Sequence, residues 1–462
     1  MIKITPYGAA KMVTGSLYLF ELDNGKKFLV ECGMFQGENE ELNYKPFPFD
    51  PKEIEYVIIT HAHLDHIGLL PKLIEEGFEG EIISTPATRD IAHIMLMDAA
   101  HVQEEEWKSQ IKRAKRRGEY VPEPLYTMED VFYTMSRFKI SVSYEGEIEL
   151  WDGKVKVKFK DAGHILGSSF LEIKIDNKNI VFSGDLGNPG KPIIKDPQNT
   201  SFENVDLLII ESTYGKRKHK SIEESIEELK EAILETFSKG GNVLIPSFAL
   251  ERAQDILFYL FQFYKEGILP KQTIIFLDSP LAINATKIFK AHTECFDTET
   301  AEMLRKGEDP FHFEKVKYTR TVEESKKIND VNSYGIIIAG SGMCQGGRIK
   351  HHLKHNLWRP ESSVVFVGYQ AKGTLGRKII DGAKEVFIYG EKVQVNSKIY
   401  TINGFSAHAD KDELIRWASE IKGKNMALVV HGEEEESKSL NDALNSIGFQ
   451  SQIAEIGKTI IV

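Results

Sequence analysis

Residues 61–66 read His-Ala-His-Leu-Asp-His and bring three imidazoles and one carboxylate into six positions. These are ligand types that suit zinc at a hydrolytic site. His61 and His63 are two residues apart and can point to one side, whereas Asp65 and His66 lie beyond a turn and can reach a second point. Incidental histidines in a polar loop are a poor alternative, because the chain has only 14 histidines among 462 residues. The segment therefore indicates two adjacent metal ions.

Further candidate ligands stand where other apolar runs end, each beside a glycine: His164, Asp185 and His431. A lone histidine or aspartate at a strand end is usually structural, but these three extend a cluster that already indicates metal. Two ions about 3.5–4 Å apart can share a hydroxide and clamp an in-line displacement. The expected set is His61, His63 and His164 for one ion, Asp65, His66 and His431 for the other, and Asp185 between them.

Short strands and hairpins are expected to position these side chains in the first part of the chain. Alternating apolar residues and turns such as Asp23-Asn24-Gly25 indicate strands joined as hairpins. Good helix formers predict a long helix over residues 88–116. The expected strands are residues 16–22, 27–31, 155–159, 170–175 and 178–182.

From about residue 207, an apolar strand, a small or polar turn and an amphipathic helix follow one another four times. This order is typical of a parallel α/β sheet, in which ligands bind outside the carboxyl ends of the strands. Any one small turn residue serves the turn alone, but four such turns together favour a phosphate-binding edge. The ligands stop at Asp185 and resume at His431, so this domain is expected to interrupt the metal domain. The four strands are residues 242–245, 273–277, 335–339 and 363–367.

Composition sets broad limits on the class of protein. A hydrophobic fraction of 41% and a charged fraction of 27% are ordinary for a globular protein. No apolar run approaches the ~20 residues that span a bilayer, and no signal-peptide core is evident at the N-terminus. The three cysteines, Cys32, Cys295 and Cys344, are too scattered for a disulfide framework. A cytoplasmic protein of two to three domains, without membrane association, is expected.

The net charge of −11 argues against a general nucleic-acid binder. Charge distribution is a separate matter, because basic runs occur at residues 108–117 and 216–220. Each run has two readings, a solvated surface segment or a contact for a polyanion.

With these residues identified, the chain resembles the metallo-β-lactamase superfamily, whose HxHxDH signature residues 61–66 fit. More narrowly, it resembles the β-CASP nucleases, such as ribonuclease J and the endonuclease subunit of the eukaryotic cleavage and polyadenylation specificity factor. The resemblance covers essentially the whole chain. The motifs that carry it are residues 8–16 (GAAKMVTGS), 32–37 (CGMFQG), 161–168 (DAGHILGS), 182–187 (FSGDLG), 211–215 (ESTYG, motif A), 341–348 (SGMCQGGR), 368–377 (GYQAKGTLGR), 406–410 (SAHAD, motif B) and 431–432 (HG, motif C).

The resemblance implies an α/β fold, an αββα metallo-β-lactamase sandwich with an inserted parallel α/β (β-CASP) domain. The sandwich would comprise residues 1–206 and 399–462, and the inserted domain residues 207–398. It further implies a zinc-dependent ribonuclease with two Zn²⁺, or Mn²⁺ in their place, that cleaves single-stranded RNA through a metal-bridging hydroxide. The resemblance does not distinguish endonuclease from 5′-exonuclease action. Because dimers are common in the family, a homodimer is compatible with it.

The resemblance also assigns roles to residues. His408 would protonate the leaving oxygen, and Glu211 would hold and tune that imidazole; the alternatives are a capping role for His408 and a domain anchor for Glu211. The expected catalytic residues are Asp65, Glu211 and His408. The expected contacts to substrate phosphate are Ser341, Gly342, Arg348 and Ser406.

One position departs from the family pattern, because Glu31 stands where Asp usually precedes Cys-Gly. This residue is expected to position the histidine loop through hydrogen bonds rather than to bind metal. Loss of such a supporting partner typically costs about 10–100-fold in affinity or activity.

Two other functions compete with a ribonuclease. A noncatalytic partner of RNA or of another nuclease would be expected to lack ligands, and all seven are present. A metal-dependent hydrolase of DNA or of another ester is compatible with the metal domain alone. The inserted domain argues against a small ester, but no residue identifies a partner for the 2′-hydroxyl that separates RNA from DNA.

Overall fold

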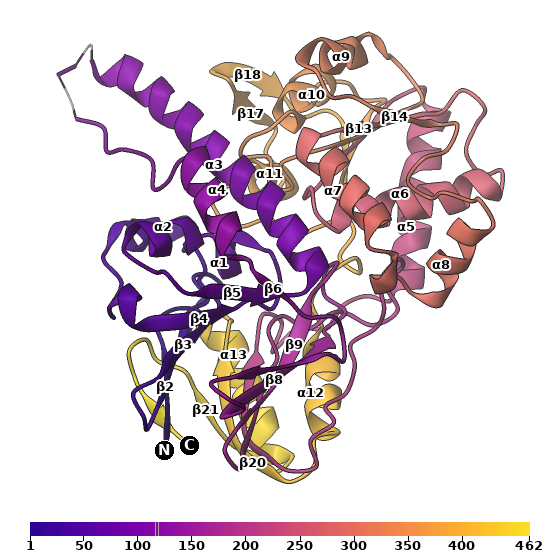
Figure 1. The fold of residues 1–462 in the computed structure, drawn as a ribbon. Helices are drawn as coiled ribbons and strands as arrows, with labels where there is room; N and C mark the ends of the chain where they lie inside the picture. The colour runs from indigo at the N-terminus through magenta and orange to yellow at the C-terminus, as the bar shows by residue number, and fades with distance from the viewer. Residues whose placement is uncertain (116, 119) are drawn as a thin grey trace. The chain divides into compact units, whose positions relative to one another are not determined.

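The computed structural model describes residues 1–115, 117–118 and 120–462 (Figure 1). These residues divide into two compact units. Unit 1 consists of Met1–Pro189, Asp196–Lys218 and His408–Val462, and unit 2 consists of Gly190–Lys195 and His219–Ala407. The polypeptide of unit 1 is thus interrupted by that of unit 2.

Unit 1 contains two mixed seven-stranded sheets. The first has the order β22-β1-β2-β3-β4-β5-β6, and the second β21-β20-β11-β10-β9-β8-β7. The strands of the first sheet are β1 (Ile2–Pro6), β2 (Tyr18–Leu22), β3 (Lys27–Val30), β4 (Ile54–Ile58), β5 (Glu81–Ser84), β6 (Ile140–Ser141) and β22 (Ile460–Ile461). Those of the second are β7 (Glu147–Leu150), β8 (Val155–Asp161), β9 (Ser169–Ile175), β10 (Lys178–Phe182), β11 (Val205–Glu211), β20 (Lys424–Val430) and β21 (Gln450–Ile453).

The two hairpins expected from the sequence are confirmed, since β2 pairs with β3 and β9 with β10, both antiparallel. Gly25 takes a φ of +80° in the first turn, which suits a residue without a Cβ. The expected long helix is present as α3, and Arg116 at its expected end lies outside the described residues. The helices of unit 1 are α1 (Leu64–Ile67), α2 (Leu70–Glu75), α3 (Pro86–Ala114), α4 (Met128–Arg137), α12 (Lys411–Ser419) and α13 (Glu434–Ser446), with 3₁₀ turns at Gly37–Tyr44 and Pro51–Glu53.

Two buried apolar clusters lie on the two faces of the second sheet of unit 1. Apolar side chains from both sheets, such as Phe20 and Phe28 of the first and Phe159 of the second, form one buried cluster, so the sheets pack face to face. The opposite face of the second sheet packs against α12 and α13, where Trp417 and Leu440 are buried. Figure 1 shows α1–α4 beside the strands of the first sheet. This is the layering of an αββα sandwich.

Unit 2 is built on a six-stranded sheet with the order β14-β13-β15-β12-β16-β19, in which every pairing is parallel. The four expected strand–turn–helix repeats lie in it. Its strands are β12 (Val243–Pro246), β13 (Ile274–Asp278), β14 (Val316–Tyr318), β15 (Gly335–Ala339), β16 (Ser363–Phe366) and β19 (Lys398–Thr401), with a separate hairpin of β17 (Glu385–Ile388) and β18 (Glu391–Gln394). Its helices are α5 (Ile222–Ser238), α6 (Arg252–Lys265), α7 (Pro280–Ala291), α8 (Thr298–Arg305), α9 (Val322–Lys327), α10 (Ile349–Asn356) and α11 (Leu375–Ile380), with 3₁₀ turns at Thr293–Cys295 and Ile328–Asp330.

Strand pairing sets the limits of the units differently from the expected division at 206/207 and 398/399. Strand β11 lies between β10 and β20 in the second sheet, so unit 1 continues to Lys218. Strand β19 pairs with β16, so unit 2 continues to Ala407. The short segment Gly190–Lys195 also belongs to unit 2, and no motif in the sequence marked it.

Among the described residues, no helix combines the length and the apolar composition needed to cross a bilayer.

Replacing Phe159 by Ala is expected to lower the free energy of unfolding by about 3–5 kcal/mol, because the ring is fully buried between the sheets and its loss leaves a cavity. Chemical unfolding followed by circular dichroism measures the change. Phe132 on α4 is 61% exposed, so Phe132→Ala is the matched control and should have little effect. Equal destabilisation by the two variants would contradict the assigned core.

Candidate metal centre

The 61–66 segment follows β4 and is fixed by backbone hydrogen bonds. The amide of Ser16 donates to the carbonyl of Asp65 at 2.8 Å, and that of Cys32 donates to the carbonyl of His66 at 2.8 Å. A Cβ at Gly33 would lie 1.6 Å from the Asp65 carbonyl oxygen, so only glycine permits this approach. These contacts fix the backbone of Asp65 and His66 independently of any bound ligand.

Three other segments supply the remaining candidate side chains. His164 follows β8, and its amide donates to Ser168 Oγ at 3.0 Å. Asp185 follows β10 through Gly184, whose φ is +53°. His431 follows β20 and its amide donates to the Ala9 carbonyl at 2.7 Å. Every candidate ligand belongs to unit 1.

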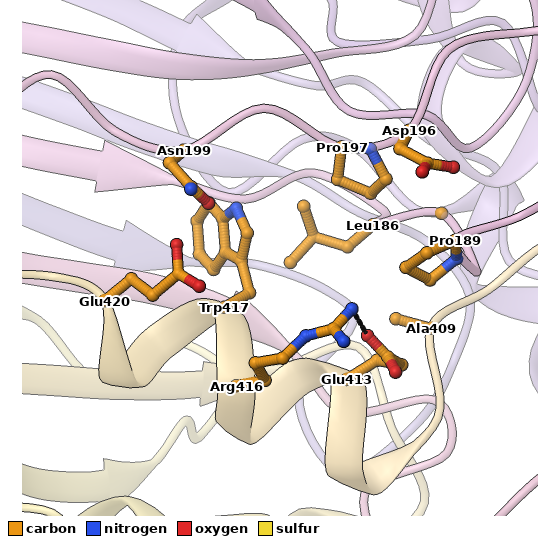
Figure 2. A pocket seen from close by; sticks show the side chains of 11 residues that line it. Leu186, Pro189, Asp196, Pro197, Asn199, Ala409, Glu413, Arg416, Trp417 and Glu420 are labelled. Carbon is orange, nitrogen blue, oxygen red and sulfur yellow. Dashed lines mark hydrogen bonds and ion pairs between the residues drawn. The ribbon is translucent and has the colours of Figure 1, made fainter.

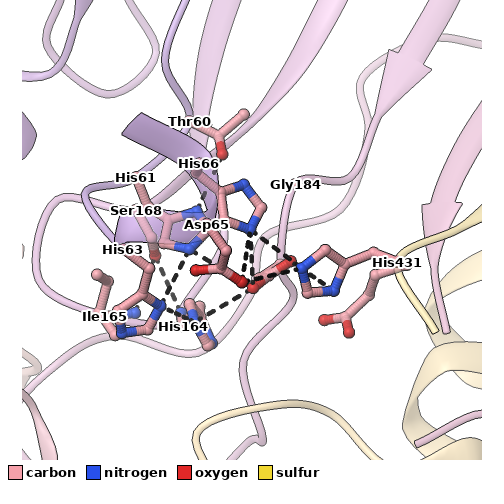
Figure 3. Close-up of polar contacts among 12 residues, drawn as sticks. Thr60, His61, His63, Asp65, His66, His164, Ile165, Ser168, Gly184 and His431 are labelled. Carbon is pink, nitrogen blue, oxygen red and sulfur yellow. Dashed lines mark hydrogen bonds and ion pairs between the residues drawn. The ribbon is translucent and has the colours of Figure 1, made fainter. Parts of the chain in front are cut away.

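His61, His63, His164 and Asp185 form a first group. Figure 3 shows the three imidazoles of this group close together. Nδ1 of His63 lies 3.2 Å from Nε2 of His61 and 3.2 Å from Nε2 of His164. Oδ2 of Asp185 lies 3.5 Å from Nε2 of His61 and 3.6 Å from Nε2 of His164. Ligand atoms about 2.0–2.1 Å from a tetrahedral zinc ion are roughly 3.3 Å from one another. The four donor atoms therefore fit around one such ion.

Asp65, His66 and His431 form a second group. Nε2 of His66 lies 3.2 Å from Nε2 of His431, and Oδ2 of Asp65 lies 3.4 Å from that same atom of His431. Oδ2 of Asp185 lies 3.4 Å from Nε2 of His66, so one carboxylate oxygen faces both groups. A carboxylate between two ions needs this position. The donor set fits two metal ions.

Burial lowers the pKa of histidines in both groups, but nearby carboxylates reverse the effect at His66. Burial lowers the pKa of His63 to about 4 and that of His61 well below its usual range, which favours the neutral imidazole that binds metal. Burial alone would also lower the pKa of His66, but the carboxylates of Asp185 and Asp65 raise it well above its usual value. The carboxylates thus favour positive charge at this point.

Two threonines that the sequence did not single out contact the Nδ1 atoms of candidate ligand histidines. Oγ1 of Thr60 lies 3.0 Å from Nδ1 of His61, and Oγ1 of Thr213 lies 3.1 Å from Nδ1 of His431. Such contacts fix ring orientation and leave Nε2 to face the ligand. In the sequence, only their positions indicated them: Thr60 directly precedes His61, and Thr213 lies within the 211–215 motif.

Glu31 lies behind His66 and is fully buried. Its Oε1 accepts a hydrogen bond from the Thr60 amide at 3.1 Å, and its Oε2 lies 3.7 Å from Nδ1 of His66. Nε2 of His66 faces the candidate ligands on the other side of the ring. The Glu31 carboxylate thus faces Nδ1 of the ring, which supports a role in orienting the imidazole. Donor atoms of Glu31, His61 and His66 also lie within 4.8 Å of one another.

His408 and Glu211 form a pair beside the candidate ligands. Nδ1 of His408 lies 3.2 Å from Oε2 and 3.3 Å from Oε1 of Glu211. Oε1 of Glu211 also accepts from the Leu186 amide at 2.6 Å, which fixes the carboxylate. Burial lowers the pKa of His408, but the carboxylates of Glu211, Asp185 and Asp65 together raise it above its usual value. The His408 side chain keeps 20% exposure, so a proton held there is within reach of a ligand.

The four expected phosphate contacts, Ser341, Gly342, Arg348 and Ser406, all belong to unit 2. The guanidinium of Arg348 is engaged within that unit: Nη1 donates to Oδ1 of Asp278 at 2.7 Å and to the Thr319 carbonyl at 3.0 Å, and Nη2 donates to the Arg320 carbonyl at 2.7 Å. Asp278 is fully buried and also contacts Nε2 of His352 at 2.6 Å. These contacts give Arg348 a structural role, which the sequence did not reveal.

The basic run at residues 216–220 is largely compensated by acidic side chains. Nε of Arg217 lies 2.9 Å from Glu436, and Nζ of Lys216 lies 3.3 Å from Glu435. Lys218 pairs with Asp412. These pairs favour a solvated surface segment. The other run includes Arg116, which lies outside the described residues.

Unit 1 also contains a cavity of about 300 Å³ beside α12 (Figure 2). Arg416 forms an ion pair with Glu413 at its wall. The cavity contains none of the candidate metal ligands, so it is distinct from the metal centre. It is lined by Leu186, Gly187, Pro189, Asp196, Pro197, Asn199, Ala409, Glu413, Arg416, Trp417 and Glu420.

Glu31→Ala is expected to weaken zinc binding about 10–100-fold, because His66 then loses the carboxylate that orients its ring. Competition between the protein and a chromophoric chelator measures the affinity. Glu31→Asp is the conservative control and should retain most of it. Unchanged zinc affinity in Glu31→Ala would contradict the positioning role.

Three family models match successive stretches of the chain. Residues 12–236 match the metallo-β-lactamase superfamily, residues 253–379 the β-CASP domain and residues 392–461 the Zn-dependent metallo-hydrolase RNA specificity domain. A solved structure of a protein of unknown function from Enterococcus faecalis V583 has a TM-score of 0.56 at 12% identity and covers 100% of both chains, which shows a shared fold.

Curated relatives are similar over most of their length. The chain is 38% identical over 461 residues to ribonuclease TTHA0252 of Thermus thermophilus, covering 100% of both proteins. It is 31% identical to transcription termination factor FttA of Methanocaldococcus jannaschii (98% of this chain, 70% of the relative) and 32% identical to an RNase J-like protein of the same organism (95% and 94%). The chain therefore belongs to the metallo-β-lactamase superfamily, among its β-CASP metal-dependent nucleases.

Proposed function

We propose that this protein is a ribonuclease that holds two zinc ions and hydrolyses phosphodiester bonds of single-stranded RNA. The observation that carries the proposal is the position of Asp185, whose Oδ2 faces His61 and His164 of one group and His66 of the other. A shared carboxylate between two imidazole groups suits a pair of ions acting on one phosphate. The similarity to a relative named ribonuclease supports RNA as the substrate.

The proposed division of ligands follows the two groups. His61, His63 and His164 would hold one ion, Asp65, His66 and His431 would hold the other, and both ions would share Asp185. Bound zinc supplies Lewis-acid stabilisation of charge on the phosphate and activates water. Zinc is the metal that matches the imidazole-rich donor set, and Mn²⁺ is the proposed substitute.

His408 is the proposed general acid. The Glu211 carboxylate accepts a hydrogen bond from Nδ1–H of His408, which leaves Nε2 to carry the second proton. That proton passes to the leaving oxygen as the phosphodiester bond breaks, while Glu211 stabilises the imidazolium that carries it. Glu211 acts through His408 and is a positioning residue in this scheme, and Asp65 contributes by its carboxylate at the second ion.

Incubation of the zinc-loaded protein with 5′-labelled single-stranded RNA is expected to give cleavage that a chelator abolishes and added zinc restores. Internal products of several sizes indicate endonuclease action, and a labelled mononucleotide indicates 5′-exonuclease action. Single-stranded DNA of the same sequence tests whether the 2′-hydroxyl is needed. Intact RNA in the presence of protein with confirmed zinc content would refute the proposed function.

His408→Ala is expected to retain zinc and to slow cleavage by about 10²–10⁴-fold, the usual contribution of a positioned acid. His431→Ala should lose zinc as well, because it removes a ligand of the second ion. Zinc content by elemental analysis and the initial rate of RNA cleavage separate the two. Exposed His101 on α3 offers the matched control His101→Ala, which should change neither quantity. Equal zinc content and equal activity in both site variants would contradict these roles.

A further inference from the structure

Three neighbouring strands of unit 2 end at the same edge of its sheet. The order β15-β12-β16 is parallel throughout, so the loops that follow these strands lie side by side. They contain Phe248 after β12, Gly342 after β15 and Gly368 with Tyr369 after β16. This edge carries small and aromatic residues that the metal chemistry does not use.

The ring of Phe248 packs on the backbone of two glycines. A Cβ at Gly342 would lie 2.8 Å from both Cδ2 and Cε2 of Phe248, and a Cβ at Gly368 would lie 3.6 Å from Cε2. A side chain at residue 342 would therefore displace the ring. Phe248 is nevertheless 44% exposed, so the glycines support the ring from within the unit while much of its surface is open to solvent.

The loops that support Phe248 are tied to each other. Nε2 of the buried Gln370 side chain donates to the Gly342 carbonyl at 2.9 Å and to the Gly368 carbonyl at 3.1 Å. One amide thus bridges the two glycines on which the ring packs. The position of Phe248 is fixed by the backbone before any ligand arrives, which reduces the entropy lost on binding.

The loop after β16 also carries a second exposed aromatic residue and a cation. Tyr369 directly follows Gly368 and is 47% exposed. Lys372, in the same loop, is exposed and forms no ion pair with any acidic side chain in the described part of the chain. Exposed aromatic rings and an ammonium group in loops at one edge of a sheet match single-stranded RNA, whose bases stack on aromatic faces while phosphates attract cations.

A single exposed apolar ring is ordinary on a protein surface. Two features set Phe248 apart: the glycines that hold it, and the pairing of aromatic with basic character in one set of loops. A protein partner is the weaker alternative, because docking of that kind favours a contiguous apolar patch, and these strand-end loops carry the exposed cation Lys372 as well as exposed rings.

We propose that Phe248 is a stacking site for one base of single-stranded RNA, flanked by Tyr369, with Lys372 contributing to attraction of the phosphate backbone. The proposal rests on the proposed ribonuclease function and adds a position in unit 2 that binds the RNA through one of its bases. Stacking of this kind tolerates any base identity, because every base has a π-face. The site therefore predicts retention of RNA without a sequence requirement.

Binding of a fluorescently labelled single-stranded RNA is measured by anisotropy in the zinc-loaded His408→Ala background, in which cleavage is slow. Phe248→Ala is expected to weaken binding about ten-fold, within the range for loss of one stacked base. Phe248→Trp should retain binding, because it keeps an aromatic face. Phe387 on β17 is 69% exposed, and Phe387→Ala is the matched control, expected to leave binding unchanged.

An abasic site moved along the RNA tests stacking directly. At one position it should weaken binding to the Phe248-containing protein by a similar factor and have no further effect in Phe248→Ala. Equal RNA affinity with and without the Phe248 ring overturns the stacking site and leaves the ribonuclease proposal intact. Absence of RNA binding by the protein that retains Phe248, with its zinc in place, overturns both.

Discussion

The Asp185 carboxylate is the group on which the arrangement of unit 1 depends. It is 2% exposed, and burial by itself would raise its pKa, but the imidazoles of His431, His66 and His61 hold that pKa well below its usual range. A buried negative charge is tolerated only where positive charge or strong hydrogen-bond donors surround it. The loops that carry the histidines must therefore converge on this one carboxylate.

Parallel pairing in the second sheet explains how such distant residues converge. Strands β10, β11 and β20 are adjacent and parallel, with Phe182 opposite Ile209 and Glu211 opposite Val430. Their carboxyl ends share one edge, so Asp185, Glu211 and His431 emerge close together. The long excursion of the chain through unit 2 leaves from this edge after β11. The contact between Glu211 and His408 shows that the chain comes back to it.

In unit 2, too, the carboxyl ends of parallel strands share one edge of the sheet, but the loops at that edge carry different side chains. Its strand-end loops carry Phe248, two glycines and hydroxyl groups, but they do not form a cluster of metal-ligand side chains comparable to that of unit 1 among the described residues. Arg348 illustrates the difference between composition and role. Its charge suggests a phosphate contact, yet the buried Asp278 carboxylate holds its guanidinium, because an unpaired acid inside the unit would be costly.

The sequence by itself determined the donor chemistry, the two hairpins, the long helix and the repeated strand–turn–helix order. These depend on residue type and on short-range periodicity, which are properties of the chain alone. Only the tertiary structure decided that His63 presents Nδ1 where His61 and His164 present Nε2, that Glu31 stands behind His66, and that β11 stays with unit 1. Ring orientation, hydrogen-bond partner and strand neighbour are set by contacts between residues far apart in the chain, and the local pattern does not specify them.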